Sequence, residues 1–233
     1  MGLDTVTLYI GYDESESLAY SVYSYSVITR ASVPVSIFPI RLGGLKGFYN
    51  RPKGIKDSTE FSVSRFLVPY LNKYRGWAIF SDCDMLMQQD IKQLWDLRDA
   101  SKAIQCVKHN HVPRETSKMM GSPQLSYSMK NWTSLMLMNC EKLKTLTPDY
   151  VSAISGLALH QFCFLESLDL VGDLPKGWNY LVGYDSDSPS YDIYNAHFTL
   201  GTPMWENCRQ ISQRWTEKWD KELENLNKSY LHG

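Results

Sequence analysis

The sequence of 233 residues lacks three features that would point to particular classes of protein: paired cysteines, long apolar runs and a large net charge. Its five cysteines form no C-x-x-C pair, so buried, reduced thiols are the expected state. No apolar run approaches the length of a membrane-spanning helix. Met1–Asp4 leads into a strand-like segment rather than a signal peptide. We therefore expect a soluble protein of a reducing, cytoplasmic compartment without a membrane span.

A net charge of -1 gives no electrostatic reason to expect a nucleic-acid partner. Hydrophobic residues make up 43% of the chain and charged residues 21%, as in ordinary globular proteins. The length fits one large domain better than two small ones. Aromatic residues, at 13%, are numerous enough to fill a core and also to line flat sugar or base surfaces.

Apolar, β-rich segments alternate with segments of helical pattern in the first half of the chain. Expected strands are 5–10, 33–40, 77–80, 103–108, 134–139 and 196–199, and expected helices are 14–29, 61–74, 90–97, one opening at Thr147-Pro148, and one at about 204–226. Such alternation predicts an α/β domain with a central, mostly parallel sheet flanked by helices. Ligands of such sheets bind at the carboxyl ends of the strands.

Two carboxylates stand directly after the apolar strand of the stretch GWAIFSDCDMLMQQD, residues 76–90. Asp82 and Asp84 are two positions apart, so in an extended chain they point to the same side and converge. Their hard oxygens would suit Mg²⁺ or Mn²⁺, which can hold a diphosphate. A pair of turn or capping aspartates is the simpler alternative. A second D-x-D pair, Asp185 and Asp187, lies in a polar stretch and is interpreted as solvated loop.

Two enzyme classes place D-x-D after a strand. Phosphatases of the haloacid dehalogenase type have Thr or Val two positions after the second Asp, where this chain has Leu86, and their motif usually follows the first strand. Nucleotide-sugar glycosyltransferases use both carboxylates for a metal. A catalytically silent nucleotide- or sugar-binding module is a third alternative.

Six segments in order carry a resemblance to a known family. They are TEFSVSRFLVPYL, GWAIFSDCDMLMQQDI, KNWTSLMLMNC, LHQF, LPKGWNYLVGYD and HFTLGTPMWENC. Together they resemble metal-dependent glycosyltransferases of the GT-A fold, related to glycosyltransferase family 8 and closest to its small bacterial and viral members. The resemblance spans most of the chain, from about Thr5 to Cys208.

The resemblance implies a single GT-A-like (Rossmann-like) domain over residues 1–233. Its nucleotide-binding half would be about 1–100, its acceptor half about 101–210 and its C-terminal helix about 204–226. The implied activity is transfer of a sugar, of the hexosyltransferase type, from a nucleotide sugar, most simply a UDP-sugar. The acceptor would be a hydroxyl of a glycan or glycoconjugate, and the cofactor Mn²⁺ or Mg²⁺.

The resemblance also implies site residues. Asp82, Asp84 and His197 would bind the metal, although a lone histidine in an apolar stretch is more often a core residue. The nucleotide-sugar candidates are Gly11, Tyr12, Asp13, Arg65, Ser81, Cys83, Gly201 and Thr202. Gly11–Asp13 could equally be a simple turn, and Cys83 could be a small residue packed behind the site. Arg65 needs an anionic partner if buried, either Asp82 or the diphosphate. No basic residue lies between His197 and Trp205.

The sugar and acceptor candidates are Trp132, Thr133, Ser134, His160, Gln161, Trp178 and Asn179. Either tryptophan could instead be plain core. The polar stretch 109–130, with Lys118 and Gln124, is long enough to be a functional loop over the donor or acceptor. An inverting enzyme would need a catalytic base, for which Asp169 is the candidate, a surface aspartate being the alternative.

Overall fold

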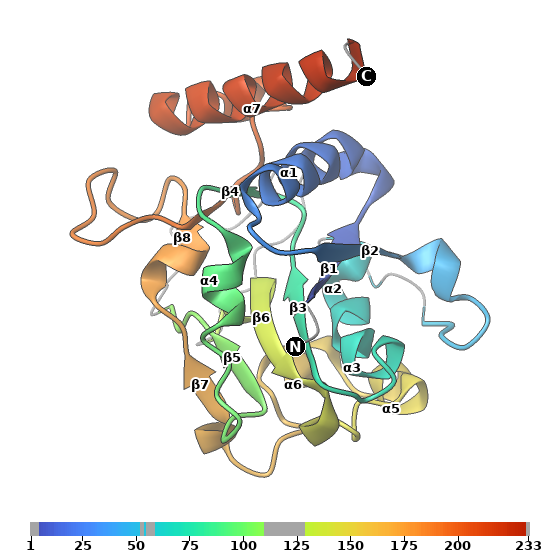
Figure 1. The fold of residues 1–233 in the computed structure, drawn as a ribbon. Coiled ribbons are helices and arrows are strands. Elements are labelled where there is room, and N and C mark those ends of the chain that lie inside the picture. The colour runs from blue at the N-terminus through green and yellow to red at the C-terminus, as the bar shows by residue number, and fades with distance from the viewer. Residues whose placement is uncertain (1–4, 52–53, 55–58, 110–128, 232–233) are drawn as a thin grey trace.

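A six-stranded sheet runs through the part of the chain that the structure, a computed structural model, describes: residues 5–51, 54, 59–109 and 129–231. The strand order is β2-β1-β3-β6-β5-β7 (Figure 1). The strands are β1 (Val6–Tyr12), β2 (Val35–Arg41), β3 (Trp77–Ser81), β5 (Ile104–Cys106), β6 (Leu135–Asn139) and β7 (Val171–Asp173). β6 is antiparallel to both neighbours and the other strands are mutually parallel. The prediction of a mostly parallel α/β sheet is confirmed.

A smaller sheet follows the end of β3. Its strands are β4 (Met85–Met87), β9 (Asn195–His197) and β8 (Tyr180–Leu181), in the order β4-β9-β8. β9 is antiparallel to β4 and parallel to β8. Because only the three residues 82–84 separate β3 from β4, the two carboxylates lie in the link between the two sheets.

Helices surround both sheets. The α-helices are α1 (Ser17–Arg30), α2 (Phe61–Ser64), α3 (Val68–Leu71), α4 (Ile91–Trp95), α5 (Pro148–Ala153), α6 (Gly156–His160) and α7 (Gln213–Leu231). Figure 1 shows α7 along the outside of α1, whereas α2, α3, α5 and α6 lie on another side of the domain. The predicted helix that opens at Thr147-Pro148 is α5, with Pro148 in its first turn. The Thr147 side chain caps it by accepting from the backbone N–H of Tyr150.

Two predicted helices differ from those in the structure. The segment 61–74 is broken into α2, a 3₁₀ turn at Arg65–Leu67 and α3. Pro69 has no N–H to continue the α-helical ladder, which accounts for the tighter turn before it. The C-terminal helix begins at Gln213 rather than near 204. The preceding segment folds back on itself, since the Arg209 guanidinium donates to the Pro203 carbonyl at 2.9 Å.

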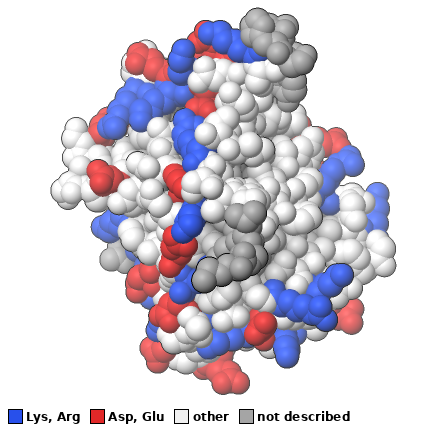
Figure 2. Space-filling model, viewed as in Figure 1, with Lys and Arg blue, Asp and Glu red and all other residues white. Residues whose placement is uncertain are grey.

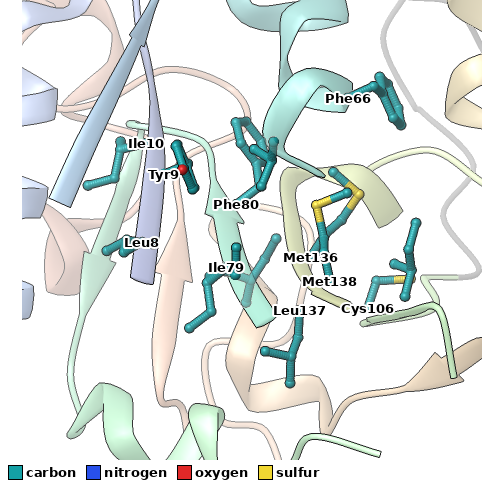
Figure 3. Packing of buried hydrophobic residues seen from close by; sticks show 14 of the residues in the cluster. Leu8, Tyr9, Ile10, Phe66, Ile79, Phe80, Cys106, Met136, Leu137 and Met138 are labelled. Carbon is teal, nitrogen blue, oxygen red and sulfur yellow. The ribbon is translucent and has the colours of Figure 1, made fainter. Parts of the chain in front are cut away.

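The main core lies between the large sheet and the helices beside it. β6 is buried along its whole length, because both of its faces are covered. Figure 3 shows its methionines and Leu137 packed among side chains of β1, β3 and β5. A strand buried on both faces reads as a continuous apolar run, which is why LMLMN was recognisable as a strand.

A second core joins α1, the small sheet and α7. Val22 of α1 packs in one cluster with Leu86 of β4, Phe198 after β9, and Trp215 and Trp219 of α7. A fork of two hydrogen bonds from the guanidinium of Arg30 in α1 to the carboxylate of Glu222 in α7, at 2.9 and 2.7 Å, ties the same helices together. α7 therefore packs with α1 against the small sheet and stabilises its position.

Charged side chains are intermixed on the surface. On the face in Figure 2, Lys and Arg are interspersed with Asp and Glu, both near the margins and in a band that runs down the face left of its centre. This distribution agrees with the net charge of -1. Within the described ranges, no helix combines the length and apolarity needed to cross a bilayer.

We predict that Trp219→Ala lowers the free energy of unfolding by about 3–5 kcal/mol, since Trp219 is 1% exposed and its removal leaves a cavity between α7 and the small sheet. Urea denaturation followed by circular dichroism measures the change. The control is Glu217→Ala, an exposed position on the same helix, which should change stability by no more than about 0.5 kcal/mol. Equal losses for both variants would contradict the role given to the second core.

Candidate functional site

The candidate residues gather at one edge of the large sheet. Asp13 follows the carboxyl end of β1 and Asp82 that of β3. β6 runs the opposite way, so its amino end, preceded by the 3₁₀ turn η5 (Trp132–Ser134), reaches the same edge. The backbone N–H of Asp82 donates to the Ser134 carbonyl at 2.8 Å, which fixes η5 beside the carboxylates. The edge is where ligands of parallel sheets bind.

The side chains of residues 81–84 alternate between core and site. Ser81 is fully buried and its hydroxyl donates to the Tyr23 hydroxyl of α1 at 2.9 Å. Cys83 is also fully buried, and burial raises the pKa of its thiol well above the ordinary value. Asp82 and Asp84 are less buried, as the alternation of an extended chain predicts. The side chains of Ser81 and Cys83 are therefore buried in the core, whereas those of Asp82 and Asp84 are partly exposed.

His197 reaches the carboxylates through strand pairing. In the antiparallel ladder of β4 and β9, Met85 lies opposite His197. The backbone N–H of Phe198 donates to the Asp84 carbonyl at 2.8 Å and closes the ladder. His197 Nε2 consequently lies 3.4 Å from Asp84 Oδ1, and the histidine is 2% exposed.

Asp82, Asp84 and His197 offer one ligand atom each within 4.8 Å of one another, which makes them the one possible metal cluster found among the described residues. Two carboxylates and an imidazole form a donor set that accepts Mn²⁺. The Nδ1 atom of His197 lies 2.9 Å from Oδ1 of Asn179, so its Nε2 atom is the one that faces Asp84. Second partners of this kind are usual for histidines that bind metals. The residues present thus fit a divalent cation.

Arg65 is buried against the first carboxylate. Its guanidinium nitrogen NH1 lies 2.9 Å from Asp82 Oδ1 and donates to the Thr133 carbonyl at 2.9 Å. The rings of Phe61 and Phe80 lie 5.5 and 4.9 Å from the guanidinium carbon. Of the two anionic partners expected from the sequence, the structure places Asp82 beside Arg65. A carboxylate has about four acceptor positions, so this ion pair leaves Asp82 capacity for a cation.

Glu16 lies near the carboxylates of Asp13, Asp82 and Asp84. It was not among the site residues expected from the sequence. It is 9% exposed, and its Oε2 accepts from the Cys83 thiol at 3.5 Å. Burial, and next the negative charge of Asp84, raise the pKa of Glu16 to about 8; Asp13 and Asp82 add to this and the Cys83 hydrogen bond opposes it. A glutamate three positions after Asp13, at the start of a helix, was the available signal.

The residues at the end of β1, Gly11, Tyr12 and Asp13, make hydrogen bonds and packing contacts within the protein. Oδ1 of Asp13 accepts from the backbone N–H and hydroxyl of Ser15 at 3.0 and 2.6 Å, and Oδ2 accepts from the Glu60 backbone at 3.1 Å. A Cβ on Gly11 would lie 2.3 Å from the Phe61 ring, so close packing explains this glycine. Tyr12 is partly exposed and meets Tyr20 edge to face at 5.2 Å. Tyr12 is the member of this segment whose ring remains accessible.

The segment after His197 turns sharply. Gly201 has a φ of +118°, a conformation that glycine adopts without strain. Thr202 is fully buried, and its hydroxyl has no hydrogen-bond partner within the described part of the chain. A buried hydroxyl without a partner is costly, so a bound ligand is one way to satisfy it.

The expected sugar and acceptor residues fall into two groups. Thr133 contacts Arg65 through its carbonyl, and its hydroxyl lies 2.7 Å from Nδ1 of His160. Trp132 is partly exposed and donates from Nε1 to the His109 carbonyl, while Gln161 is partly exposed at the end of α6. Trp132, Thr133, Ser134 and His160 lie at the edge of the sheet that carries the carboxylates.

Trp178 and Asn179 are buried side chains behind the site, and Asp169 lies away from it. Trp178 is 2% exposed and its ring lies 5.0 Å from that of Tyr194, as in the core alternative. Asn179 is fully buried behind His197. Asp169 is exposed and precedes β7, so it lies at the opposite edge of the sheet, where its carbonyl accepts from Lys102. The structure does not bring Asp169 together with the carboxylate pair.

A further ion pair stands at the site edge. Lys108 follows β5, and its ammonium lies 3.1 Å from the carboxylate of Asp173, the last residue of β7. The same ammonium lies 5.9 Å from the centre of the Trp132 ring. Lys108 and Asp173 were not predicted as site residues, although their positions at the carboxyl ends of parallel strands could have indicated this edge. Lys118 and Gln124 lie outside the described residues.

Solved structures with a similar fold are glycosyltransferases. The galactosyltransferase LgtC, solved with donor and acceptor sugar analogues, aligns over 94% of this chain and 96% of its own, with a TM-score of 0.59 and 12% identity. Mouse xyloside xylosyltransferase 1 aligns over 86% of this chain and 99% of its own, with a TM-score of 0.56 and 14% identity. At such identities the likeness concerns the fold, which is that of GT-A glycosyltransferases.

No family model matches the chain. Protein CDI of Arabidopsis thaliana is 43% identical to it over 231 residues, which cover 95% of this chain and 87% of that protein. An identity of this size over nearly the whole length shows common descent. The chain therefore belongs to the family of the Arabidopsis thaliana Protein CDI.

Proposed function

We propose that the protein is a metal-dependent glycosyltransferase. It would transfer a sugar from a nucleotide sugar, in the first instance a UDP-sugar, to a hydroxyl of a glycan or glycoconjugate. The observation that carries the proposal is the cluster of Asp82, Asp84 and His197 at the carboxyl edge of a GT-A-type sheet. LgtC, which shares this fold, was solved with donor and acceptor sugar analogues.

Asp82, Asp84 and His197 would hold Mn²⁺ or Mg²⁺, which when bound supplies positive charge to a leaving diphosphate. Tyr12 would stack on the base with its accessible ring, and Asp13 would border the nucleoside. The backbone turn at Gly201 would allow close approach of the diphosphate, with the Thr202 hydroxyl as a donor. Arg65 would hold Asp82 in place.

Transfer breaks the bond between the anomeric carbon and the diphosphate oxygen, and the nucleoside diphosphate leaves with the electron pair. The acceptor oxygen forms the new glycosidic bond and loses its proton to the leaving diphosphate or to water. The acceptor would lie beside Trp132, Thr133 and His160, on the side of the edge formed by β6, β5 and β7. Holding both substrates in line is the protein's main contribution.

The charge of the site supports a cationic occupant. Asp13, Glu16, Asp82 and Asp84 lie close enough for their charges to interact, since the pKa of Glu16 is raised mainly by burial and further by the three aspartates. Arg65 forms an ion pair with Asp82, and His197 lies beside Asp84. A divalent cation would relieve the remaining repulsion, which is why crowded carboxylates are typical of metal sites.

We predict that Mn²⁺ together with one UDP-sugar of a donor panel raises the melting temperature, because a ligand bound only to the folded state stabilises it by mass action. The same donor should release UDP when an acceptor is present. Asp84→Asn should abolish the Mn²⁺-dependent rise and lower UDP release by about 100-fold or more. Thermal-shift assays and a coupled UDP assay measure both effects.

The control is Asp169→Asn, the same chemical change at the opposite edge of the sheet, which should keep both activities at the wild-type level. Binding of UDP-sugar without any turnover would indicate a silent binding module. Absence of both binding and turnover over the whole panel with Mn²⁺ and Mg²⁺ would contradict the proposal.

A second prediction follows from Glu16. Its pKa in the folded protein, about 8, lies above the ordinary 4.5, so the folded state favours its protonated form. The associated stability is complete below about pH 4.5 and is lost as pH rises toward 8. Without divalent cations, Glu16→Gln should therefore remove part of the decline in unfolding free energy across this window. Urea denaturation at stepped pH measures it.

Glu217→Gln, at an exposed position of α7, is the control and should follow the wild-type profile. Adding Mn²⁺ should reduce the decline in the wild-type protein, because a nearby cation favours ionised carboxylates. A Glu16→Gln profile parallel to that of the wild type would refute the assignment.

A further inference from the structure

A closed set of hydrogen bonds lies behind His197. Asn179, at the end of the 3₁₀ turn η8 (Lys176–Asn179), is fully buried and presents Oδ1 to His197 Nδ1 at 2.9 Å. Its Nδ2 donates to the Asn131 carbonyl at 3.0 Å and to the Ser134 hydroxyl at 2.9 Å. The Ser134 hydroxyl in turn donates to the same Asn131 carbonyl at 2.7 Å. The amide of Asn179 thus has a partner on both of its ends.

This arrangement determines where the hydrogens lie. The Asn131 carbonyl can only accept, so the atom of Asn179 facing it must be the amide nitrogen. The amide oxygen is then the atom that faces His197, and Nδ1 must donate the hydrogen bond. In the neutral ring the other nitrogen, Nε2, then carries a lone pair.

The lone pair of Nε2 points toward a carboxylate. Nε2 lies 3.4 Å from Asp84 Oδ1, so two electron-rich atoms face each other across a short gap. A proton on Nε2 or a metal ion liganded by both atoms would make such a contact favourable. The cluster of three ligand atoms can accommodate the metal ion. The tautomer follows from the hydrogen bonds of Asn179 and the gap from the pairing of β4 with β9, and both are compatible with a metal ion bound by Nε2.

The backbone that accepts these bonds is itself held in place. Asn131 has a φ of +66°, a left-handed conformation that asparagine tolerates better than most residues. Its side-chain oxygen accepts from the hydroxyl of Thr199, two residues after His197, at 3.4 Å. Asn131 therefore contacts the segment of His197 directly through its side chain and indirectly through Asn179.

We propose that Asn179 is a positioning residue that keeps the hydrogen on Nδ1 of His197 and so presents Nε2 as a metal ligand. This assignment replaces the sugar or acceptor role expected for Asn179 from the sequence. The metal ligation rests on the proposed function, whereas the tautomer does not. Partners of this kind typically change metal affinity by about 10–100-fold when they are removed.

The test begins with the protein free of metal at pH 8, labelled with ¹⁵N in its histidines. Two-bond ¹⁵N–¹H correlation spectra report which ring nitrogen carries the hydrogen, and His197→Asn identifies the signals. We expect Nδ1–H with an unprotonated Nε2 for His197 in the wild-type protein. A hydrogen on Nε2 would overturn the proposal.

The second measurement is the Kd for Mn²⁺ by calorimetry. Asn179→Leu should weaken binding by about 10–100-fold, whereas Asn179→Asp, which keeps an acceptor at Nδ1, should retain the Nδ1–H form and bind more tightly than Asn179→Leu. Asn195→Leu is the matched control, because Asn195 is equally buried and on the same strand as His197, but its amide contacts the sulfur of Met85. Equal weakening by Asn179→Leu and Asn195→Leu would reduce Asn179 to a packing residue.

The two levels of the proposal fail in different ways. If wild-type His197 shows Nδ1–H but the protein binds neither Mn²⁺ nor Mg²⁺, the proposed function is wrong and the positioning of the ring stands. If Mn²⁺ binds and the Kd of Asn179→Leu equals that of the wild type, the role of Asn179 is wrong and the metal site stands. Should Asn179→Leu not fold, the spectrum of the wild type and the Kd of Asn179→Asp still decide.

Discussion

The antiparallel pairing of β4 with β9 is the contact on which the candidate site depends. It places His197 opposite Met85 and so beside Asp84, although Met85 and Asn195 of the same ladder are 110 residues apart in the sequence. Two elements keep the ladder in register. The Phe198 backbone bonds to the Asp84 carbonyl in front, and the second core of α1 and α7 covers the small sheet behind. A one-residue slip of β9 would turn His197 to the other face of the sheet and remove it from the cluster.

Burial of charge is the second constraint, and it acts on both members of the carboxylate pair. Asp82 is neutralised in part by Arg65, which is itself held between two phenylalanine rings and two backbone carbonyls. Asp84 has a histidine rather than a guanidinium as its partner. The two carboxylates therefore face different surroundings. One is anchored by a permanent cation, and the other lies beside the Nε2 atom of a histidine ring.

Much of the fold could be predicted from the sequence, because its buried strands are short apolar runs with clear ends. β3 and β6 read plainly as strands, and the alternation of side chains after β3 gave the direction of both carboxylates. The positions of Asp169 and Asn179 could not be predicted in this way. Which edge of the sheet Asp169 occupies depends on where β7 begins, and the segment from Gly156 to Asp187 has no periodic pattern. Asn179 becomes a partner of His197 through pairing of β8 with β9, which only the folded chain brings together.

Ser134 makes hydrogen bonds toward both carboxylates of the pair. Its carbonyl accepts from the backbone of Asp82, and its hydroxyl bridges Asn179 and Asn131. Thr133, the preceding residue, accepts from Arg65 and contacts His160. Two adjacent residues just before β6 are therefore linked to both carboxylates. Thr133 is linked to Asp82 through Arg65, and Ser134 is linked to Asp84 through Asn179 and His197. Because β6 is the antiparallel strand, its amino end rather than its carboxyl end lies at the ligand edge, and this reversal is what allows η5 to reach both halves of the cluster.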